Sequence, residues 1–227
     1  MIGTGDGLRD GDVCRLAREL YRDTAVITRL QQMGRPFICP FDKLGVHVPP
    51  GSRLLDIGCG AGLFVLSLAS AGRIVSALAV DTNAAGITAA KAALQRLPAK
   101  CDVRFATIGP DDPLPAGIFD VISLIDVTHH VPVSAQQIFL ERVVQHVPPG
   151  GVLLYKDMCD APAWKAWGNR LHDLVVARQR INYVPLEMME SIGMKGGLHA
   201  LHKDSYTRFF YGHELLVLER PSNGPPA

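Results

Sequence analysis

The fold of this chain is decided by the stretch Leu54-Leu55-Asp56-Ile57-Gly58-Cys59-Gly60-Ala61-Gly62. Its apolar first half predicts a short buried strand, and the apolar run that follows Gly62 predicts a helix. The glycines stand at every second position of the turn between them. Glycine lets a backbone approach a ligand closely, and the start of a helix offers N–H donors to that ligand. The stretch therefore predicts a βαβ unit with a ligand site in its first turn.

The spacing of these glycines argues against a dinucleotide. The dinucleotide fingerprint is G-x-G-x-x-G, whereas this chain has G-x-G-x-G and carries Leu63 where the third glycine should stand. Asp56 precedes the first glycine by two positions, where its carboxylate would repel a pyrophosphate and suit a cationic ligand. Both departures count against NAD.

A second acid follows the next strand. Asp81 ends the apolar run 74–81, and Thr82 and Asn83 come directly after it. A carboxylate at this place lies within reach of a bound ribose and accepts hydrogen bonds from both of its hydroxyls. Asn83 is also placed to cap the next helix.

Outward from this turn, apolar strands alternate with helices. We expect strands at 53–57, 74–81, 102–107, 119–126 and 151–158, and helices at 63–71, 84–97 and 136–147. Ser134 and Gln137 form a candidate capping box for the third helix. Repeated βα units with apolar strands predict an α/β fold, with a mostly parallel sheet covered by helices on both faces and right-handed crossovers.

The flanks depart from this alternation. Apolar residues at helical spacing predict an N-terminal helix over about 13–33, ended by Gly34 and Pro36. After the fifth strand we expect helices at about 162–180 and 186–193, then strands at 199–210 and 213–219 joined at Tyr211-Gly212, one of them antiparallel at a sheet edge. We expect a helical cap over 1–45 and a main domain over 46–220, into which a helical lid is inserted at 158–184. Residues 221–227 are expected to form a flexible tail.

Composition narrows the class of protein. The 227 residues are 48% hydrophobic and 20% charged with a net charge of +1, which excludes a disordered chain and gives no long-range field for gripping nucleic acid. The five cysteines include no C-x-x-C pair, which fits thiols in a reducing compartment. The acidic, glycine-rich start is not a secretory signal, and no apolar stretch is long enough to span a membrane. We expect a soluble, cytoplasmic protein.

At this point the sequence resembles the class I S-adenosylmethionine-dependent methyltransferases, and most closely their UbiE-like small-molecule group. The resemblance covers residues 46–160 and rests on the glycine stretch, on Asp81, on FDVISLIDVTHHVP from Phe119 and on PPGGVLLYKDM from Pro148. The run YGHELLVLER is similar to the last, antiparallel strand of that family. The resemblance implies a Rossmann-like, mostly parallel seven-stranded sheet, with S-adenosyl-L-methionine as cofactor and S-adenosyl-L-homocysteine as its product.

The resemblance also implies roles for cofactor-binding residues. The glycine loop and the first acid would hold the methionine part, and the acid after the second strand would hold the ribose: Asp56, Gly58, Cys59, Gly60, Gly62, Asp81, Thr82 and Asn83. Similar enzymes often carry Gly-Asp-Ala ahead of a Leu-Pro pair, with the acid facing the adenine amino group. This chain has Gly109-Pro110-Asp111-Asp112 there, so Pro110 takes the usual acid position and Asp111 is the substitute.

The residues after the fourth strand are the candidates for catalysis. Transfer of a methyl group from a sulfonium needs alignment and, for an oxygen or nitrogen acceptor, removal of a proton. His129 and His130 are the candidate general bases, because histidine is neutral and basic near pH 7. The alternative is that the histidine pair is a scaffold element. Asp126 is assigned to the cofactor site; it would otherwise contact the acceptor, orient a histidine or simply be a solvated strand end.

Two classes of methyltransferase are disfavoured by the same loops. A metal-dependent catechol-type enzyme would need an Asp-Asn pair after the fifth strand, where this chain has Lys156-Asp157-Met158, so we expect no metal. The (Asn/Asp/Ser)-Pro-Pro-(Tyr/Phe) signature of enzymes that methylate DNA bases is absent from Asp126-Val127-Thr128-His129.

The acceptor is less well marked. Apolar residues in and after the expected lid either line an acceptor pocket or, as their helical spacing favours, pack in the core: Met158, Trp164, Trp167, Tyr183, Met188, Met189 and Met194. His199 and His202 are expected to be solvated edge residues.

These features predict a methyltransferase that acts on a small, partly hydrophobic metabolite, with O-methylation favoured over N- or C-methylation. The alternatives are a cofactor-binding protein without catalysis and a protein or RNA methyltransferase. The second of these would need a basic docking face, for which the chain offers only Lys91, Arg96, Lys100 and Arg104. A nicotinamide oxidoreductase is the weakest alternative.

Overall fold

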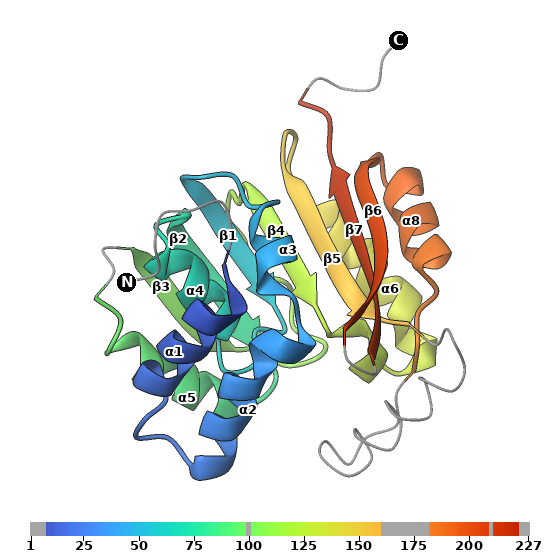
Figure 1. Ribbon diagram of the computed structural model, residues 1–227. Helices are drawn as coiled ribbons and strands as arrows, with labels where there is room; N and C mark the ends of the chain where they lie inside the picture. Colours follow the sequence, from blue (N-terminus) through green and yellow to red (C-terminus); the bar gives the residue numbers. More distant parts are fainter. Residues whose placement is uncertain (1–7, 99–100, 160–181, 209–210, 223–227) are drawn as a thin grey trace. The chain divides into compact units, whose positions relative to one another are not determined.

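The computed structural model describes residues 8–98, 101–159, 182–208 and 211–222. The chain divides into two compact units, Met1–Pro113 and Leu114–Ala227, which we call the N-terminal unit and the C-terminal unit. In Figure 1 the N-terminal unit runs from blue to green and the C-terminal unit from yellow-green to red. The helix expected over about 162–180 and most of the predicted lid lie outside the described residues. The boundaries of cap, lid and tail therefore stay predictions.

The described part of the N-terminal unit contributes three parallel strands to the sheet. They are β1 (Ser52–Ile57), β2 (Ile74–Asp81) and β3 (Asp102–Thr107), in the order β3-β2-β1. The register pairs Leu55 with Leu78, and Leu78 with Arg104. Because all three strands run the same way, the turns that follow β1 and β2 emerge at the same edge of the sheet.

The crossover helices of this unit are α4 (Leu63–Ser70) and α5 (Ala84–Leu94). Every residue of α4 up to Ala69 is buried, which suits its apolar sequence LFVLSLA. On α5 only Ile87, Ala90 and Ala93 are buried, one face at helical spacing. The predicted boundaries of both helices are close to those observed.

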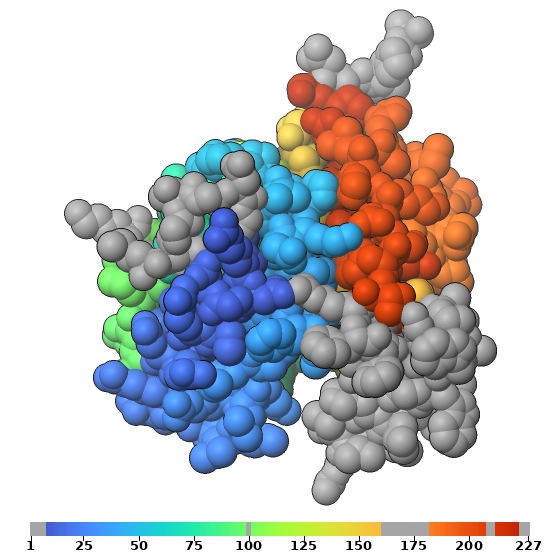
Figure 2. All heavy atoms as spheres, in the orientation of Figure 1, coloured from blue at the N-terminus to red at the C-terminus, as the bar shows by residue number. Residues whose placement is uncertain are grey.

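The N-terminal segment contains three helices, α1 (Asp10–Leu20), α2 (Val26–Ile38) and α3 (Phe41–Gly45). The prediction of one helix over about 13–33 is wrong, because the chain turns between α1 and α2, where the Thr24 hydroxyl donates to the Tyr21 carbonyl at 2.7 Å. The predicted stop at Gly34 and Pro36 is wrong as well. Pro36 lies in the last turn of α2, where its missing N–H removes only one helical bond. Figure 2 shows α1 and α2, in blue, at the surface of their unit.

Among the described residues, the C-terminal unit contributes four strands to the sheet, in the order β4-β5-β7-β6. The strands β4 (Val121–Ile125) and β5 (Val152–Met158) are parallel. The last strand, β7 (Tyr211–Glu219), is antiparallel both to β5 and to β6 (His199–Arg208). Helix α6 (Val133–His146) crosses from β4 to β5, and α8 (Leu186–Lys195) packs against α6, β6 and β7. The predicted mostly parallel, seven-stranded α/β sheet with an antiparallel last strand is confirmed.

Two local predictions in this unit are corrected. The hairpin does not turn at Tyr211-Gly212, because both residues lie in β7 and pair with Arg208 and Thr207. Ser134 is not a helix cap, because α6 begins at Val133 after Pro132. The carbonyl of Pro132 accepts the first helical hydrogen bonds, from Ala135 at 2.8 Å and from the following residue at 3.1 Å.

Arg220 ties several helix ends of the C-terminal unit together. Its guanidinium donates to the carbonyls of Val147 at 2.6 Å, Val144 at 2.9 Å and Gly196 at 2.9 Å. These carbonyls lie at the C-terminal ends of α6 and α8, where helical partners are lacking and a cation is favourable. Within the described ranges, no helix has the length and apolar character needed to cross a bilayer.

Candidate functional site

The predicted glycine loop joins β1 to α4 in the N-terminal unit. Gly58, Gly60 and Gly62 have φ angles of 77°, 55° and 81°, in the left-handed region that glycine adopts without strain. The N–H groups of Gly58 and Cys59 donate to the carbonyl of Val80 at 2.8 and 3.1 Å, which fixes the loop beside the end of β2. The glycine turn that the sequence predicted between the first strand and its helix is present, and the structure adds its left-handed backbone.

The two later glycines are required for different reasons. A Cβ on Gly62 would lie 2.6 Å from the Phe105 ring, so packing within the unit excludes a side chain there. A Cβ on Gly60 would meet no protein atom within 4 Å. Gly60 thus borders open space, as a residue that a ligand approaches closely should.

Asp81 is bound directly to the glycine loop. Its Oδ2 accepts the Gly60 N–H at 2.6 Å, and its Oδ1 accepts the Asn83 N–H at 2.7 Å. Each carboxylate oxygen can accept a second hydrogen bond, so the side chain can still bind the two hydroxyls of a ribose. Asn83 caps α5, as predicted, with its Oδ1 accepting from the N–H groups of Ala85 and Gly86 at 3.1 Å each. Thr82 lies exposed between the two.

The electrostatics of the loop favour a cation. Asp56 is buried at the end of β1, with an exposed fraction of 3%. The pKa of the Cys59 thiol is raised far above its ordinary value, first by burial and then by the negative charges of Asp56 and Asp81. The negative charges of these two acids, unlike burial itself, would favour a positively charged ligand group.

Asp111 lies in the exposed loop after β3. The neighbouring Asp112 accepts the Gly109 N–H at 2.6 Å and so braces the loop, while Asp111 remains exposed. The adenine role assigned to Asp111 stays a prediction.

Tyr21 is a residue of this region that sequence reasoning missed. Its hydroxyl donates to the Ala61 carbonyl at 2.5 Å, which links the end of α1 to the glycine loop. The ring is fully buried, and burial raises the pKa of the phenol. Tyr21 directly follows α1, and nothing in the local sequence pattern indicated its partner.

In the C-terminal unit, Asp126 follows β4 in a left-handed backbone conformation. Its φ of 57° is the one positive value at a non-glycine residue in the described part of the chain. Its carboxylate forms an ion pair with Lys156, and its N–H donates to the Lys156 carbonyl at 2.8 Å. The lysine side chain is fully buried, so the pair is shielded from solvent. Asp126 is therefore not a solvated strand end, and its assignment to the cofactor stays a prediction.

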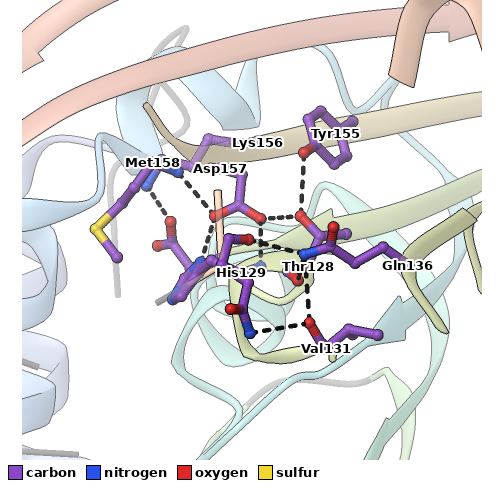
Figure 3. A network of polar contacts seen from close by, with 10 residues as sticks. Thr128, His129, Val131, Gln136, Tyr155, Lys156, Asp157 and Met158 are labelled. Atoms are coloured by element: carbon purple, nitrogen blue, oxygen red, sulfur yellow. Dashed lines mark hydrogen bonds and ion pairs between the residues drawn. The ribbon is translucent and has the colours of Figure 1, made fainter. Parts of the chain in front are cut away.

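The two histidines lie on the short 3-10 turn η1 (Thr128–His130) in different environments. His129 is buried, with an exposed fraction of 2%, whereas His130 is exposed. Their ring centroids are 4.0 Å apart. The Nδ1 atom of His129 contacts the carboxylate of Asp157 on β5. Figure 3 shows this pair at the centre of a polar network.

Asp157 accepts hydrogen bonds from several donors. Its Oδ2 accepts from the Thr128 hydroxyl and from the His129 N–H, the latter at 3.2 Å, and its Oδ1 accepts the Met158 N–H at 2.8 Å. The Tyr155 hydroxyl lies 3.0 Å from the Thr128 hydroxyl (Figure 3). The pKa of Tyr155 is raised, first by burial and then by the charge of Asp157.

The turn itself is held from α6. Gln136 donates through Nε2 to the carbonyls of Thr128 and Val131, both at 3.3 Å, and to that of Asn182 at 2.8 Å. The Asn182 N–H in turn donates to the His129 carbonyl at 2.9 Å. The turn that bears the histidines is thus braced by several partners.

Comparison with known proteins decides the family. The sequence family described as a methyltransferase domain matches residues 31–203. The chain belongs to this methyltransferase family. The prediction of a class I S-adenosylmethionine-dependent methyltransferase is thereby confirmed.

Individual relatives agree with the family. The chain is 37% identical over 174 residues to a ubiquinone biosynthesis O-methyltransferase of Bradyrhizobium sp. (strain ORS 278), which covers 75% of this chain and 60% of that protein. It is similar in structure to an O-methyltransferase family protein from Burkholderia thailandensis, with a TM-score of 0.69 and 19% identity over 95% of this chain and 64% of the other. It is also similar to magnesium protoporphyrin IX methyltransferase from Synechocystis PCC 6803 with bound SAH, with a TM-score of 0.63 and 18% identity over 91% and 93% of the two chains. The chain thus spans less than two thirds of the curated relative.

Among the residues that the structure describes, no group of three or more His, Cys, Asp or Glu side chains gathers as a metal site would require. His199 and His202 are exposed on β6, as predicted. Reaction without a metal remains an expectation.

Proposed function

We propose that this chain transfers a methyl group from S-adenosyl-L-methionine to a small, partly hydrophobic metabolite, with an oxygen as the favoured acceptor atom. The observation that carries the proposal is the bond between Asp81 and the Gly60 N–H, in a loop with left-handed glycines and open space. This arrangement offers a ribose-binding carboxylate beside a backbone that a ligand can approach.

The residues of the loop fit this cofactor. Asp56 is buried at the end of β1, and the negative charges of Asp56 and Asp81 beside Cys59 suit a cationic sulfonium. When bound, the cofactor supplies an electrophilic methyl group on that sulfonium. The loop with Asp56 would hold the methionine part, and Asp81 with Thr82 and Asn83 would hold the ribose. Asp111 would face the adenine, and Asp126 completes the proposed cofactor set.

The chain's own chemical contribution is proton removal. An alcohol or phenol becomes a strong nucleophile as it loses its proton, and a positioned histidine speeds such a step by about 10²–10⁴-fold. The turn Thr128–His130 supplies two histidines for this role. Support for an oxygen acceptor comes from the curated relatives, which are named as O-methyltransferases.

Calorimetry with S-adenosylhomocysteine, S-adenosylmethionine and NAD tests the cofactor assignment. We expect binding of the first two in the micromolar range or tighter and none of NAD. Incubation with S-adenosylmethionine and a set of phenolic, catecholic, amine and thiol acceptors then tests the acceptor class, with S-adenosylhomocysteine formation as the readout. Binding of NAD alone, or turnover only with amines, would contradict the proposal.

A further inference from the structure

The two histidines of the turn differ in one respect that bears on catalysis. Only His129 is buried against a carboxylate, and that carboxylate is itself held by other donors. We propose that Asp157 is a positioning residue that selects His129, rather than His130, as the general base. This inference rests on the proposed function and assigns a role to a residue that the sequence motifs left out.

The first step of the argument concerns the tautomer of His129. A carboxylate only accepts hydrogen bonds, so the ring nitrogen that contacts it, Nδ1, must carry the proton. A neutral imidazole with a proton on Nδ1 has its basic lone pair on Nε2. Asp157 therefore defines Nε2 as the nitrogen that accepts a proton.

The second step concerns the direction of the hydrogen bonds behind Asp157. The Thr128 hydroxyl donates its single hydrogen to Asp157, so its 3.0 Å contact with Tyr155 must be donated by the tyrosine. The order is therefore Tyr155 to Thr128 to Asp157. All three side chains are buried, and Figure 3 shows the contacts that link them. A carboxylate held in this way cannot rotate without breaking several buried bonds.

The third step is the contrast with His130. Its side chain is exposed, so burial does not hold it in place as it holds His129. It also lies against the His129 ring.

The reaction balances with this assignment. As the C–O bond forms and the C–S bond breaks, the hydroxyl proton of the acceptor moves to Nε2 of His129. The sulfonium charge is lost, and the positive charge appears on an imidazolium that faces the Asp157 carboxylate. The titratable groups around this pair include Tyr155 on β5, His130 on the same turn and Glu214, which pairs with Asp157 in the register of β5 with β7. Release of the proton to solvent restores the neutral base.

The test compares Asp157→Asn with Glu190→Gln, an acid-to-amide change at an exposed ion pair with Lys203 in the same unit. With catechol as acceptor, we expect Asp157→Asn to lower kcat by about 10²-fold or more while the Kd of S-adenosylhomocysteine changes less than about twofold. The acidic limb of the pH–kcat profile should move to lower pH, because a facing carboxylate favours the imidazolium. Glu190→Gln should match the wild type in kcat, in the Kd of S-adenosylhomocysteine and in the pH–kcat profile.

A second pair of variants guards against misfolding of Asp157→Asn. Thr128→Val removes the hydroxyl that holds Asp157 and should lower kcat about tenfold, whereas Thr128→Ser keeps the hydroxyl and should restore most of it. Nitrogen NMR should show the Nδ1–H form of His129 in the wild type and its loss in Asp157→Asn.

These readouts separate the two proposals. A kcat within about threefold of wild type in Asp157→Asn, or an unchanged tautomer and pH profile, would overturn the positioning role. A wild type that shows the Nδ1–H tautomer and binds S-adenosylhomocysteine but methylates none of the acceptors would instead overturn the proposed function.

Discussion

The carboxylate of Asp81 accepts the N–H of Gly60 at 2.6 Å, so the end of β2 is bonded to the middle of the glycine loop. One side chain thereby fixes the loop and remains able to bind a ribose. The glycine loop and the acid after β2 were assigned to the cofactor independently, and this hydrogen bond holds them together.

Replacing Asp81 should weaken cofactor binding. We expect Asp81→Ala to reduce the affinity for S-adenosylhomocysteine by about 10–100-fold, because charge-assisted hydrogen bonds are worth roughly 1–3 kcal/mol. Calorimetry measures the change, and circular dichroism shows whether the fold is intact. The control is Asp102→Asn, at an exposed acid of the same unit that pairs with Arg104. Equal affinities of Asp81→Ala and wild type would remove the ribose assignment.

Substitutions at the two later glycines should separate binding from stability. Gly60→Ala meets no protein atom and should lower the free energy of unfolding by only about 1 kcal/mol while cofactor affinity falls. Gly60→Val should bind the cofactor more weakly still than Gly60→Ala. Gly62→Ala places a Cβ 2.6 Å from the Phe105 ring and should cost about 3 kcal/mol.

Thermal melts and calorimetry on the same samples distinguish these effects. If Gly60→Val binds S-adenosylhomocysteine like the wild type, the loop is not part of the cofactor site.

Alkaline pH should destabilise the protein. Burial raises the pKa values of Tyr21, Cys59 and Tyr155 in the folded state, so these groups stay protonated while the unfolded chain loses its protons. Stability is therefore fully present below about pH 8, where the unfolded cysteine and tyrosines are still protonated, and falls as the pH rises further. Each group contributes a loss of up to about 1.4 kcal/mol per pH unit once its unfolded form has ionised.

Urea unfolding between about pH 8 and 11 measures this loss. Tyr155→Phe should flatten the slope, because phenylalanine has no group to titrate. A free energy of unfolding that stays constant above pH 10 would contradict the burial argument.

Loss of Arg220 should destabilise the C-terminal unit. Arg220→Ala leaves the carbonyls of Val144, Val147 and Gly196 without their charged donor and should cost about 2 kcal/mol. Lys203→Ala, which breaks only an exposed ion pair, should change stability little. Hydrogen exchange near the C-terminal ends of α6 and α8 should rise in Arg220→Ala alone; equal exchange in both variants would show that the arginine does not hold these ends.

The sequence predicted those features that depend on neighbours along the chain. The glycine loop, the acid after β2 and the Asn83 cap each follow from a local pattern, as does the alternation of strands and helices. The break between α1 and α2 was missed because apolar spacing continues across it. The predicted start of α6 was too late in the chain, because Pro132 fixes the helix start more strongly than the polar residues after it.

The partner of His129 was missed for a different reason. Asp157 belongs to another strand, and its contact with the turn depends on the pairing of β4 with β5, which no local pattern encodes. The alternation of Tyr155 and Asp157 along β5 was the available signal, because a buried acid on a core strand needs a partner.

The most direct test of the account is the fate of an isotopically labelled methyl group. The wild-type protein is incubated with S-adenosylmethionine carrying a carbon-13 methyl and with catecholic and hydroquinone acceptors, and the products are followed by carbon NMR. The account predicts a labelled methoxy signal together with one equivalent of S-adenosylhomocysteine. Label that remains entirely on sulfur, or that appears only on nitrogen or carbon, would contradict it.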